Sequence, residues 1–296
     1  MNLPAIATVD RFLQPLVGTT LLLGVLLVWQ RTYDQSCVAL ATPALVYVAI
    51  IYGLLEYRLE RKRFAVDYYL DRGSSWRRRL RGMWLPVVIS TVAALPLAVF
   101  LVVFAALSRP TDWLFLAAAA VMAPFLFDRI SRWPGRHFRR DASAGDRRIA
   151  IADILSARLA GWVLLALIGV AYVYFNYMVI GGPPYIYPNS LQLTVEAFTA
   201  GVQSACPVVD DGLRAAAALE GSSWYVVTSA ATASWTPNGI RVVVWIAFFL
   251  NAALAMAGFV RGLEGCMLAA WRIDSRNREA PLEAERRGTD VEHASE

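Results

Sequence analysis

The stretch Trp84–Leu107 reads WLPVVISTVAALPLAVFLVVFAAL and contains no charged side chain. A helix of about 17–25 apolar residues is long enough to cross a hydrocarbon core about 30 Å thick. We therefore predict that this stretch spans a membrane. Pro96 lies near its middle, where proline removes a backbone hydrogen bond, so we expect a kink there.

Apolar blocks of similar length recur along the 296-residue chain, which is 57% hydrophobic and only 17% charged. Soluble globular proteins have about 25% charged residues. The blocks predict an all-α, polytopic membrane protein with six spans and no cleavable signal peptide. Besides 84–107, the predicted spans are 13–29, 38–55, 113–127, 154–180 and 240–260. We expect residues 1–280 to form one transmembrane domain and residues 281–296 to form a disordered cytoplasmic tail.

Arginine-rich segments set the expected orientation. Segments 56–83 and 128–148 join spans on one side, and basic loops usually stay in the cytoplasm. Of the 28 lysine and arginine residues, only Arg31, Arg109, Arg214 and Arg241 fall on the other side. We predict a multi-pass protein of the bacterial cytoplasmic (inner) membrane with both termini inside. We expect its basic loops to contact anionic lipid headgroups. This contact accounts for the excess of positive charge, so we predict no nucleic-acid partner.

The sequence lacks the common catalytic, metal and cofactor motifs. Its two histidines, His137 and His293, lie in predicted cytoplasmic segments, and there is no His-Glu-x-x-His, Gly-x-Ser-x-Gly or Walker pattern. Asp67 and Asp71 have helical spacing, but nearby arginines favour a salt-paired surface over a metal site. We predict no catalytic residue, no metal and no cofactor. The predicted spans also hold almost no ionisable residue, which argues against a proton-driven transporter.

The segment between the last two spans, 181–239, is the most informative part of the chain. Residues 191–205 and 209–219 have helical character. Residues 221–235, GSSWYVVTSAATASW, are small and apolar but too short to cross a bilayer. We expect a re-entrant or interfacial helix followed by the turn Thr236-Pro237-Asn238-Gly239, since irregular backbone at membrane depth must be buried or line a cavity.

This order of elements resembles the pore module of tetrameric cation channels, in which a pore helix and a filter lie between the last two helices. Trp224-Tyr225-Val226-Val227-Thr228 is similar to a pore helix, and 236–241 is similar to the segment after the filter. The chain has no Thr-Val-Gly-Tyr-Gly filter, no acidic filter residue and no regularly spaced arginines in the fourth span. The resemblance therefore implies neither potassium selectivity nor voltage gating.

Two sets of residues are candidates for a channel-like or transport-like pore. Hydroxyl and amide side chains form the expected constriction: Thr228, Thr232, Ser234, Thr236 and Asn251. Carboxylates form an expected outer mouth that concentrates cations: Glu196, Asp210, Asp211 and Glu220. The alternative is that 185–239 only closes the bundle, with small residues allowing close helix packing and Asn251 acting as a hydrogen-bond partner between helices.

Two further hypotheses compete with a pore. Without catalytic groups, the chain can be a non-catalytic subunit or scaffold of a larger membrane complex, and we expect either that or a homo-oligomer. A lipid-processing enzyme at the basic loops, using Asp67 and Asp71, ranks third.

Three cysteines complete the candidate residues. The predicted topology places Cys37 and Cys206 on the non-cytoplasmic side and Cys266 on the cytoplasmic side. A Cys37–Cys206 disulfide is possible in an oxidising compartment; two free thiols are the alternative.

Overall fold

The described residues of the computed structural model form helices and no strand. They comprise 3–69, 84–131, 145–175, 190–232 and 252–270, with isolated residues between 186 and 250. The long helices are α1 (Leu3–Thr32), α2 (Ala41–Tyr69), α4 (Trp84–Leu107), α5 (Pro110–Ser131) and α6 (Gly145–Tyr174). A short 3-10 helix, η1 (Cys37–Leu40), precedes α2, and α7 (Leu191–Thr199) and α8 (Pro207–Thr232) follow α6.

Within the part of the chain that the structure describes, six segments are long and apolar enough to cross a membrane, so the chain is compatible with a multi-pass membrane protein. They are Leu13–Thr32, Cys37–Lys62, Trp84–Leu107, Pro110–Ser131, Ile154–Tyr174 and Phe248–Ala270. The first five lie close to the predicted positions. The sixth ends ten residues beyond the predicted end at Val260, because it includes the charged residues Arg261 and Glu264.

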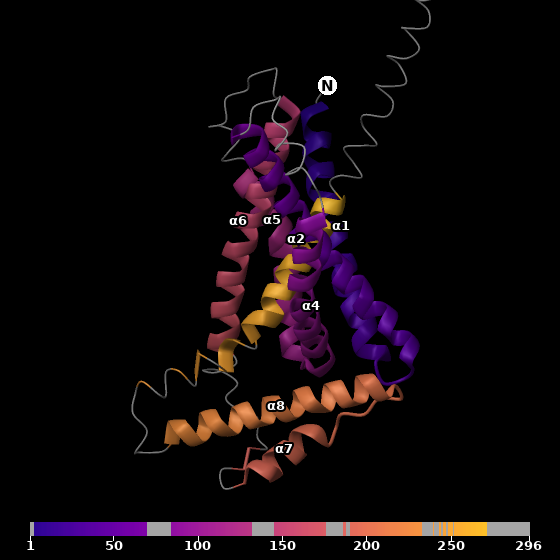
Figure 1. Ribbon diagram of the computed structural model, residues 1–296, viewed down its shortest axis with the longest axis vertical. Coiled ribbons are helices and arrows are strands. Elements are labelled where there is room, and N and C mark those ends of the chain that lie inside the picture. Colours follow the sequence, from indigo (N-terminus) through magenta and orange to yellow (C-terminus); the bar gives the residue numbers. More distant parts are fainter. Residues whose placement is uncertain are drawn as a thin grey trace, which may run out of the picture.

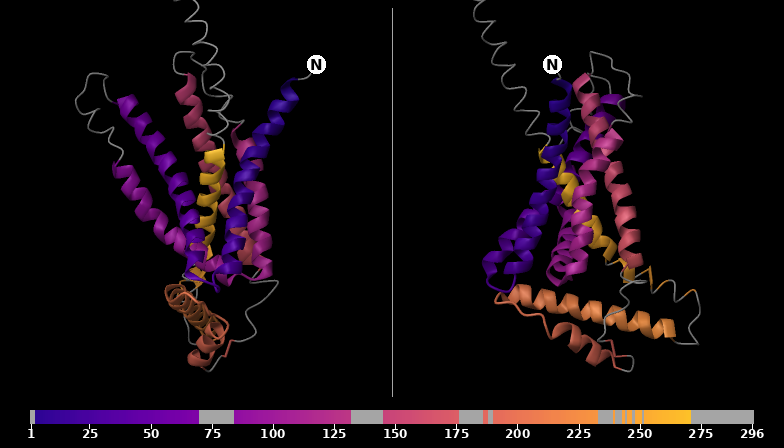
Figure 2. Two further views of the ribbon diagram at one scale, coloured as in Figure 1. Left: turned by 90° about the vertical axis from the view of Figure 1, so that its right-hand side faces the viewer. Right: turned by 180° about the vertical axis from the view of Figure 1, so that it is seen from behind.

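The last span, Phe248–Ala270, is the central helix of the bundle (Figure 2). Over an apolar stretch of 18 residues in each span, 67% of the residues are buried in the last span, against 28–39% in the other five. The largest fully buried side chains on it are Phe259, Met256 and Leu263. The other spans bury one stripe and leave large apolar side chains such as Leu21, Val92 and Val170 exposed, as expected for helices that face lipid.

Glycines allow other helices to approach this central helix closely. A Cβ atom on Gly265 would lie 2.0 Å from the backbone oxygen of Ala49 in α2, and one on Gly53 would lie 2.6 Å from the backbone oxygen of Arg261. Small residues are common at such contacts in membranes because packing, not water exclusion, holds the helices together. A hydrogen bond also joins α1 to α4, since Trp29 Nε1 donates to the Val102 backbone oxygen at 2.9 Å.

Helices α7 and α8, which we call the cap, lie across one end of the bundle (Figure 1). Ser190 caps α7, its hydroxyl accepting the Leu193 N–H. Pro207 occupies the first position of α8, where proline is tolerated. A helix at 209–219 and a separate re-entrant or interfacial helix at 221–235 were expected. Instead α8 continues through Gly221, where a Cβ atom would meet the Phe198 ring of α7 at 3.0 Å.

Candidate functional site

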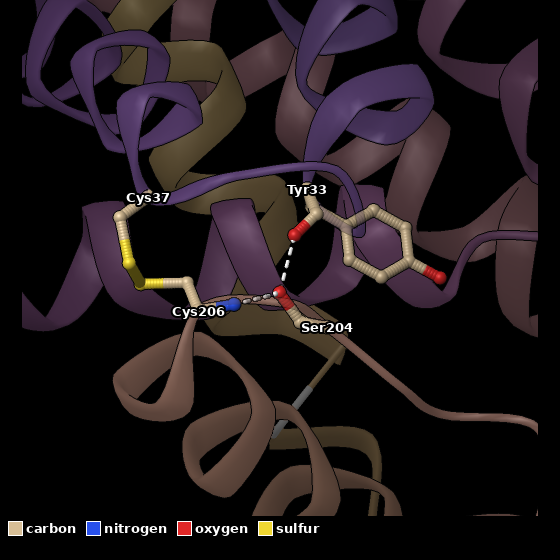
Figure 3. Close-up of a disulfide and its surroundings, with 4 residues drawn as sticks. All are labelled: Tyr33, Cys37, Ser204 and Cys206. Carbon is tan, nitrogen blue, oxygen red and sulfur yellow. Dashed lines mark hydrogen bonds between the residues drawn. A yellow bond between two sulfur atoms is a disulfide. The ribbon is translucent and has the colours of Figure 1, made fainter.

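The residues directly before α8 are fixed to the turn after α1 and to the start of η1 (Figure 3). A disulfide joins Cys37 to Cys206, with an S–S distance of 2.06 Å. The Ser204 hydroxyl donates to the Tyr33 backbone oxygen at 2.5 Å, and the Ala205 N–H donates to the Asp34 backbone oxygen at 3.0 Å. The start of α8 is therefore held by one covalent bond and two hydrogen bonds.

A cavity of about 250 Å³ lies beneath α8. Its roof is one face of α8, where lining residues recur at helical spacing: Gly212, Ala216, Leu219, Glu220, Ser223 and Trp224. Its walls come from α4, the end of α6 and the start of the last span, and include Phe100, Phe104, Tyr172, Phe248 and Phe249. Elements distant in the sequence thus enclose one largely apolar space that includes several aromatic side chains.

Charged and polar side chains gather at the cap end of this cavity; we call Arg109, Asp112, Tyr172 and Glu220 the polar rim. Arg109 lies in the turn before α5, and its backbone N–H donates to Asp112 Oδ2 at 2.8 Å. That bond caps α5, because a carboxylate in the first turn satisfies a free helical N–H. Tyr172 also hydrogen-bonds to Asp112, and Asp112 is only 6% exposed.

Glu220 supplies the cap's contribution to the polar rim. Its carboxyl accepts a hydrogen bond from the Trp224 side chain. Burial raises the pKa of Glu220 above its ordinary value, and Asp112 adds to the increase, while the Arg109 guanidinium and the Trp224 hydrogen bond oppose it. Since burial is the largest of these effects, the carboxylate form of Glu220 is costly here.

A second charged group lies inside the bundle; we call Arg158, Arg261 and Glu264 the buried ion cluster. Arg158 Nη1 of α6 lies 3.0 Å from Glu264 Oε2, and Arg261, one turn before Glu264, contacts its other oxygen. Glu264 is 2% exposed and Arg261 is 4% exposed. The expectation that the spans hold almost no ionisable residue missed this cluster, in which the single carboxylate of Glu264 pairs with both arginines.

Neighbouring side chains support the buried ion cluster. The Arg158 guanidinium lies 4.9 Å from the centre of the Tyr57 ring, and that of Arg261 lies 4.7 Å from the centre of the Trp162 ring. Such cation–π contacts strengthen when water is excluded. Gly161 makes room for the acid, since a Cβ there would lie 1.9 Å from Glu264 Oε1. The cluster fills its space and leaves no room for a ligand of its own.

Of the five predicted constriction residues, Thr228 has a described side chain. Thr228 lies in α8, and its hydroxyl donates to the backbone oxygens of Trp224 and Tyr225 in the same helix. Thr232 ends α8, but its side chain lies outside the described residues, as do Ser234, Thr236 and Asn251. Whether these residues line a pore stays a prediction.

The four predicted mouth carboxylates occupy different surroundings. Glu196 is exposed on α7 and accepts a hydrogen bond from Gln192 at 2.9 Å. Asp210 pairs with Arg214 at 2.8 Å, and Asp211 is exposed. Glu220 alone of the four lines the cavity. Cys266, placed in the cytoplasm from the sequence, lies within the last span as a free thiol.

Sequence reasoning missed the buried ion cluster and the partners of Glu220. One signal for the cluster was present: Arg261 and Glu264 are three residues apart between apolar residues and therefore share a helix face. Comparison of the chain with protein-family models, with curated proteins and with solved structures found no match.

Proposed function

We propose that this chain is a transport-like component of the bacterial inner membrane that takes a small molecule into the cavity beneath α8. The observation that carries the proposal is the cavity itself, which combines aromatic walls with a few converging polar groups. Binding sites for small molecules usually have this composition.

The geometry favours such a binding site over an ion-conducting pore. A pore-loop module needs a half-helix that dips into the bundle and then breaks, whereas α8 runs unbroken from Pro207 to Thr232 across its end (Figure 1). The middle of the bundle is occupied by the last span, with Phe259 and Leu263 fully buried. A pore built from several copies of the last two helices remains a weaker form of the same proposal.

The cap is proposed to face the periplasm. Arg58, Arg61 and Arg129 lie at span ends on the side opposite the cap, as the positive-inside rule requires for the cytoplasmic side. The disulfide is consistent with this placement, because such bonds persist in oxidising compartments.

Flux measurements in proteoliposomes test the proposal, with a fluorescent single-chain lipid as the probe and dithionite quenching as the readout. We expect the protein to accelerate transfer of the probe between leaflets. Ala216→Trp, which fills the cavity, should abolish the acceleration. Ala215→Trp, at an exposed position of the same helix, should not. Equal transfer in protein-free liposomes would rule out this activity.

A second candidate function is a non-catalytic subunit of a larger membrane complex. Its support is the apolar outer surface of the cap, where Val208 is 75% exposed and Leu193 is 50% exposed outside the membrane spans. Extraction in a mild detergent distinguishes the two: a subunit should co-purify with other chains in fixed stoichiometry, and Val208→Asp should release them.

A further inference from the structure

The exposed residues among the cavity lining belong to α4 and α8 and are all apolar. Val99 of α4 is 52% exposed, and Leu219 of α8 is 57% exposed. Gly212, two turns before Leu219 on the same face of α8, is also exposed. By contrast Ala255, which lines the cavity from the last span, is 2% exposed. The cavity is therefore open between α4 and α8; we call Val99, Gly212 and Leu219 the mouth.

The mouth continues the surface of α4 that faces lipid. Val88, Val92, Leu95 and Val99 follow one another at intervals of three or four residues and therefore share one face of the helix. Each of the four is at least half exposed, as expected for side chains that contact lipid within a span. This face runs along α4 toward the cap and reaches the cavity at Val99.

On α4, the mouth lies at the depth of the lipid chains. This helix has 24 residues, and its length of about 36 Å slightly exceeds a hydrocarbon core of about 30 Å. Val99 precedes the end of the helix at Leu107 by eight residues, or about 12 Å. An upright, centred α4 would therefore place Val99 about 9 Å inside the edge of the hydrocarbon core.

The space behind the mouth suits hydrocarbon better than water. An ordered water needs about two to four polar partners, and the side chains of Phe100, Val103 and Phe104 that line the cavity offer none. If the space stayed empty, these walls would lose dispersion contacts. A lipid chain restores the contacts without leaving an apolar medium. The cavity, at about 250 Å³, is larger than an engineered cavity of about 150 Å³ that holds benzene, so a segment of one chain has room.

We propose that the mouth admits a hydrocarbon chain of a neighbouring lipid, sideways from the bilayer, into the cavity beneath α8. The proposal rests on the cavity of the proposed function, and it names both the class of ligand and the route of entry. It does not require that the lipid be moved across the membrane.

Photo-crosslinking from within the bilayer tests the proposal. The protein is reconstituted in phosphatidylcholine nanodiscs that contain a small fraction of diacyl phosphatidylcholine with a diazirine midway along one chain. Tandem mass spectrometry assigns the label to single residues. We expect label on Ala252 and Ala255, which line the cavity from the last span, as well as on Val92 at the lipid surface. Label on Val92 without label on Ala252 or Ala255 would overturn the proposal.

Two tryptophan variants of α4 separate entry through the mouth from labelling at the lipid surface. Val99→Trp places a large ring in the mouth. Val92→Trp places the same ring on the same face of α4, two turns away and outside the described lining of the cavity. The first should remove the label from Ala252 and Ala255, and the second should not. Label that persists in a folded Val99→Trp would overturn the mouth as the route.

A second pair of variants, on α8, covers the case in which Val99→Trp does not fold. Leu219→Trp narrows the mouth from the cap, and Val226→Trp lies two turns further along the same exposed face, outside the described lining. Size-exclusion profiles and unfolding temperatures identify the folded variants. Loss of the cavity label in Leu219→Trp, but not in Val226→Trp, supports the proposal, and equal labelling of the two overturns it.

The flux assay separates this inference from the proposed function. Label in the cavity without flux would refute transport alone. Flux that persists in folded Val99→Trp and Leu219→Trp would refute entry through the mouth alone.

Discussion

At the scale of single residues, Glu220 makes the stability of the folded protein depend on pH. Burial raises its pKa, so the folded protein holds the proton at pH values where the unfolded chain has lost it. In that window the native state binds more protons, and stability therefore falls as pH rises. The loss begins near the ordinary value of 4.5 and is complete above the raised pKa.

Glu220→Gln should remove this dependence, because an amide needs no proton to stay neutral. We expect the variant to gain thermal stability at pH 7 relative to the wild type and to differ little at pH 4. Thermal unfolding in detergent across that range measures it. Glu196→Gln is the control, since Glu196 is exposed. The assignment would be contradicted if the wild type became more stable between pH 5 and 7 and Glu220→Gln were less stable than the wild type.

Glu264 is the residue on which the buried ion cluster depends. Its two oxygens are taken by Arg158 and Arg261. Replacing one partner of a buried ion pair typically costs about 3–5 kcal/mol, because the remaining charge stays buried without compensation. We expect Glu264→Gln to unfold at a much lower temperature, and Asp211→Asn, on the exposed side of α8, to unfold like the wild type. Equal unfolding temperatures would show that the arginines find other partners.

At the scale of helices, charge patterning explains both the successes and the miss of the sequence analysis. The bounds of α4 follow from its sequence, since the uncharged run from Trp84 to Leu107 is the helix itself. The end of the sixth span was misplaced because Arg261 looks like a cytoplasmic boundary when read alone. Glu264 pairs with Arg261 in the same helix and also with Arg158, which is 106 positions away along the chain, so hydropathy cannot detect the pairing that lets these charges be buried.

The candidate site was less predictable than the spans, for a related reason. The part of α8 that contains Thr228 was predicted to line a pore. The Thr228 hydroxyl instead donates to the Trp224 backbone oxygen in the same helix. The cavity depends on side chains of α4, α6, α8 and the last span meeting at one place, which no local pattern encodes. Glu220 could be selected from composition as one of four acids, but only the fold distinguishes it from Glu196 and Asp211.

The contact between α2 and the last span gives a prediction at this scale. Gly265→Ala would place a Cβ 2.0 Å from the backbone oxygen of Ala49, which cannot rotate away. We expect a loss of about 1–3 kcal/mol from overpacking, seen as a lower unfolding temperature. Gly24→Ala in α1, where nothing lies within 4 Å, should be neutral or slightly stabilising. Equal behaviour of the two variants would mean that α2 and the last span are further apart.

At the scale of the whole molecule, the central last span connects the two charged groups. It begins beside the cavity at Phe248 and Phe249 and later carries Arg261 and Glu264. Between these levels the interior is filled by Met256 and Phe259, both fully buried. A transport cycle would therefore need the surrounding helices to move against the last span. Close glycine contacts hold α1, α2 and α4 against it, at Gly18, Gly265 and Gly258.

The orientation of the molecule can be tested with single cysteines in a Cys266→Ala background, where the disulfide occupies the other two thiols. Asp211→Cys reports on the cap and Arg61→Cys on the opposite end, and both positions are exposed. Arginines at that opposite end should remain in the cytoplasm. A membrane-impermeant maleimide should therefore label only Asp211→Cys in intact spheroplasts and both variants after lysis. Labelling of Arg61→Cys alone would place the cap in the cytoplasm, where its disulfide would be exposed to reduction and the cavity would open toward the opposite compartment.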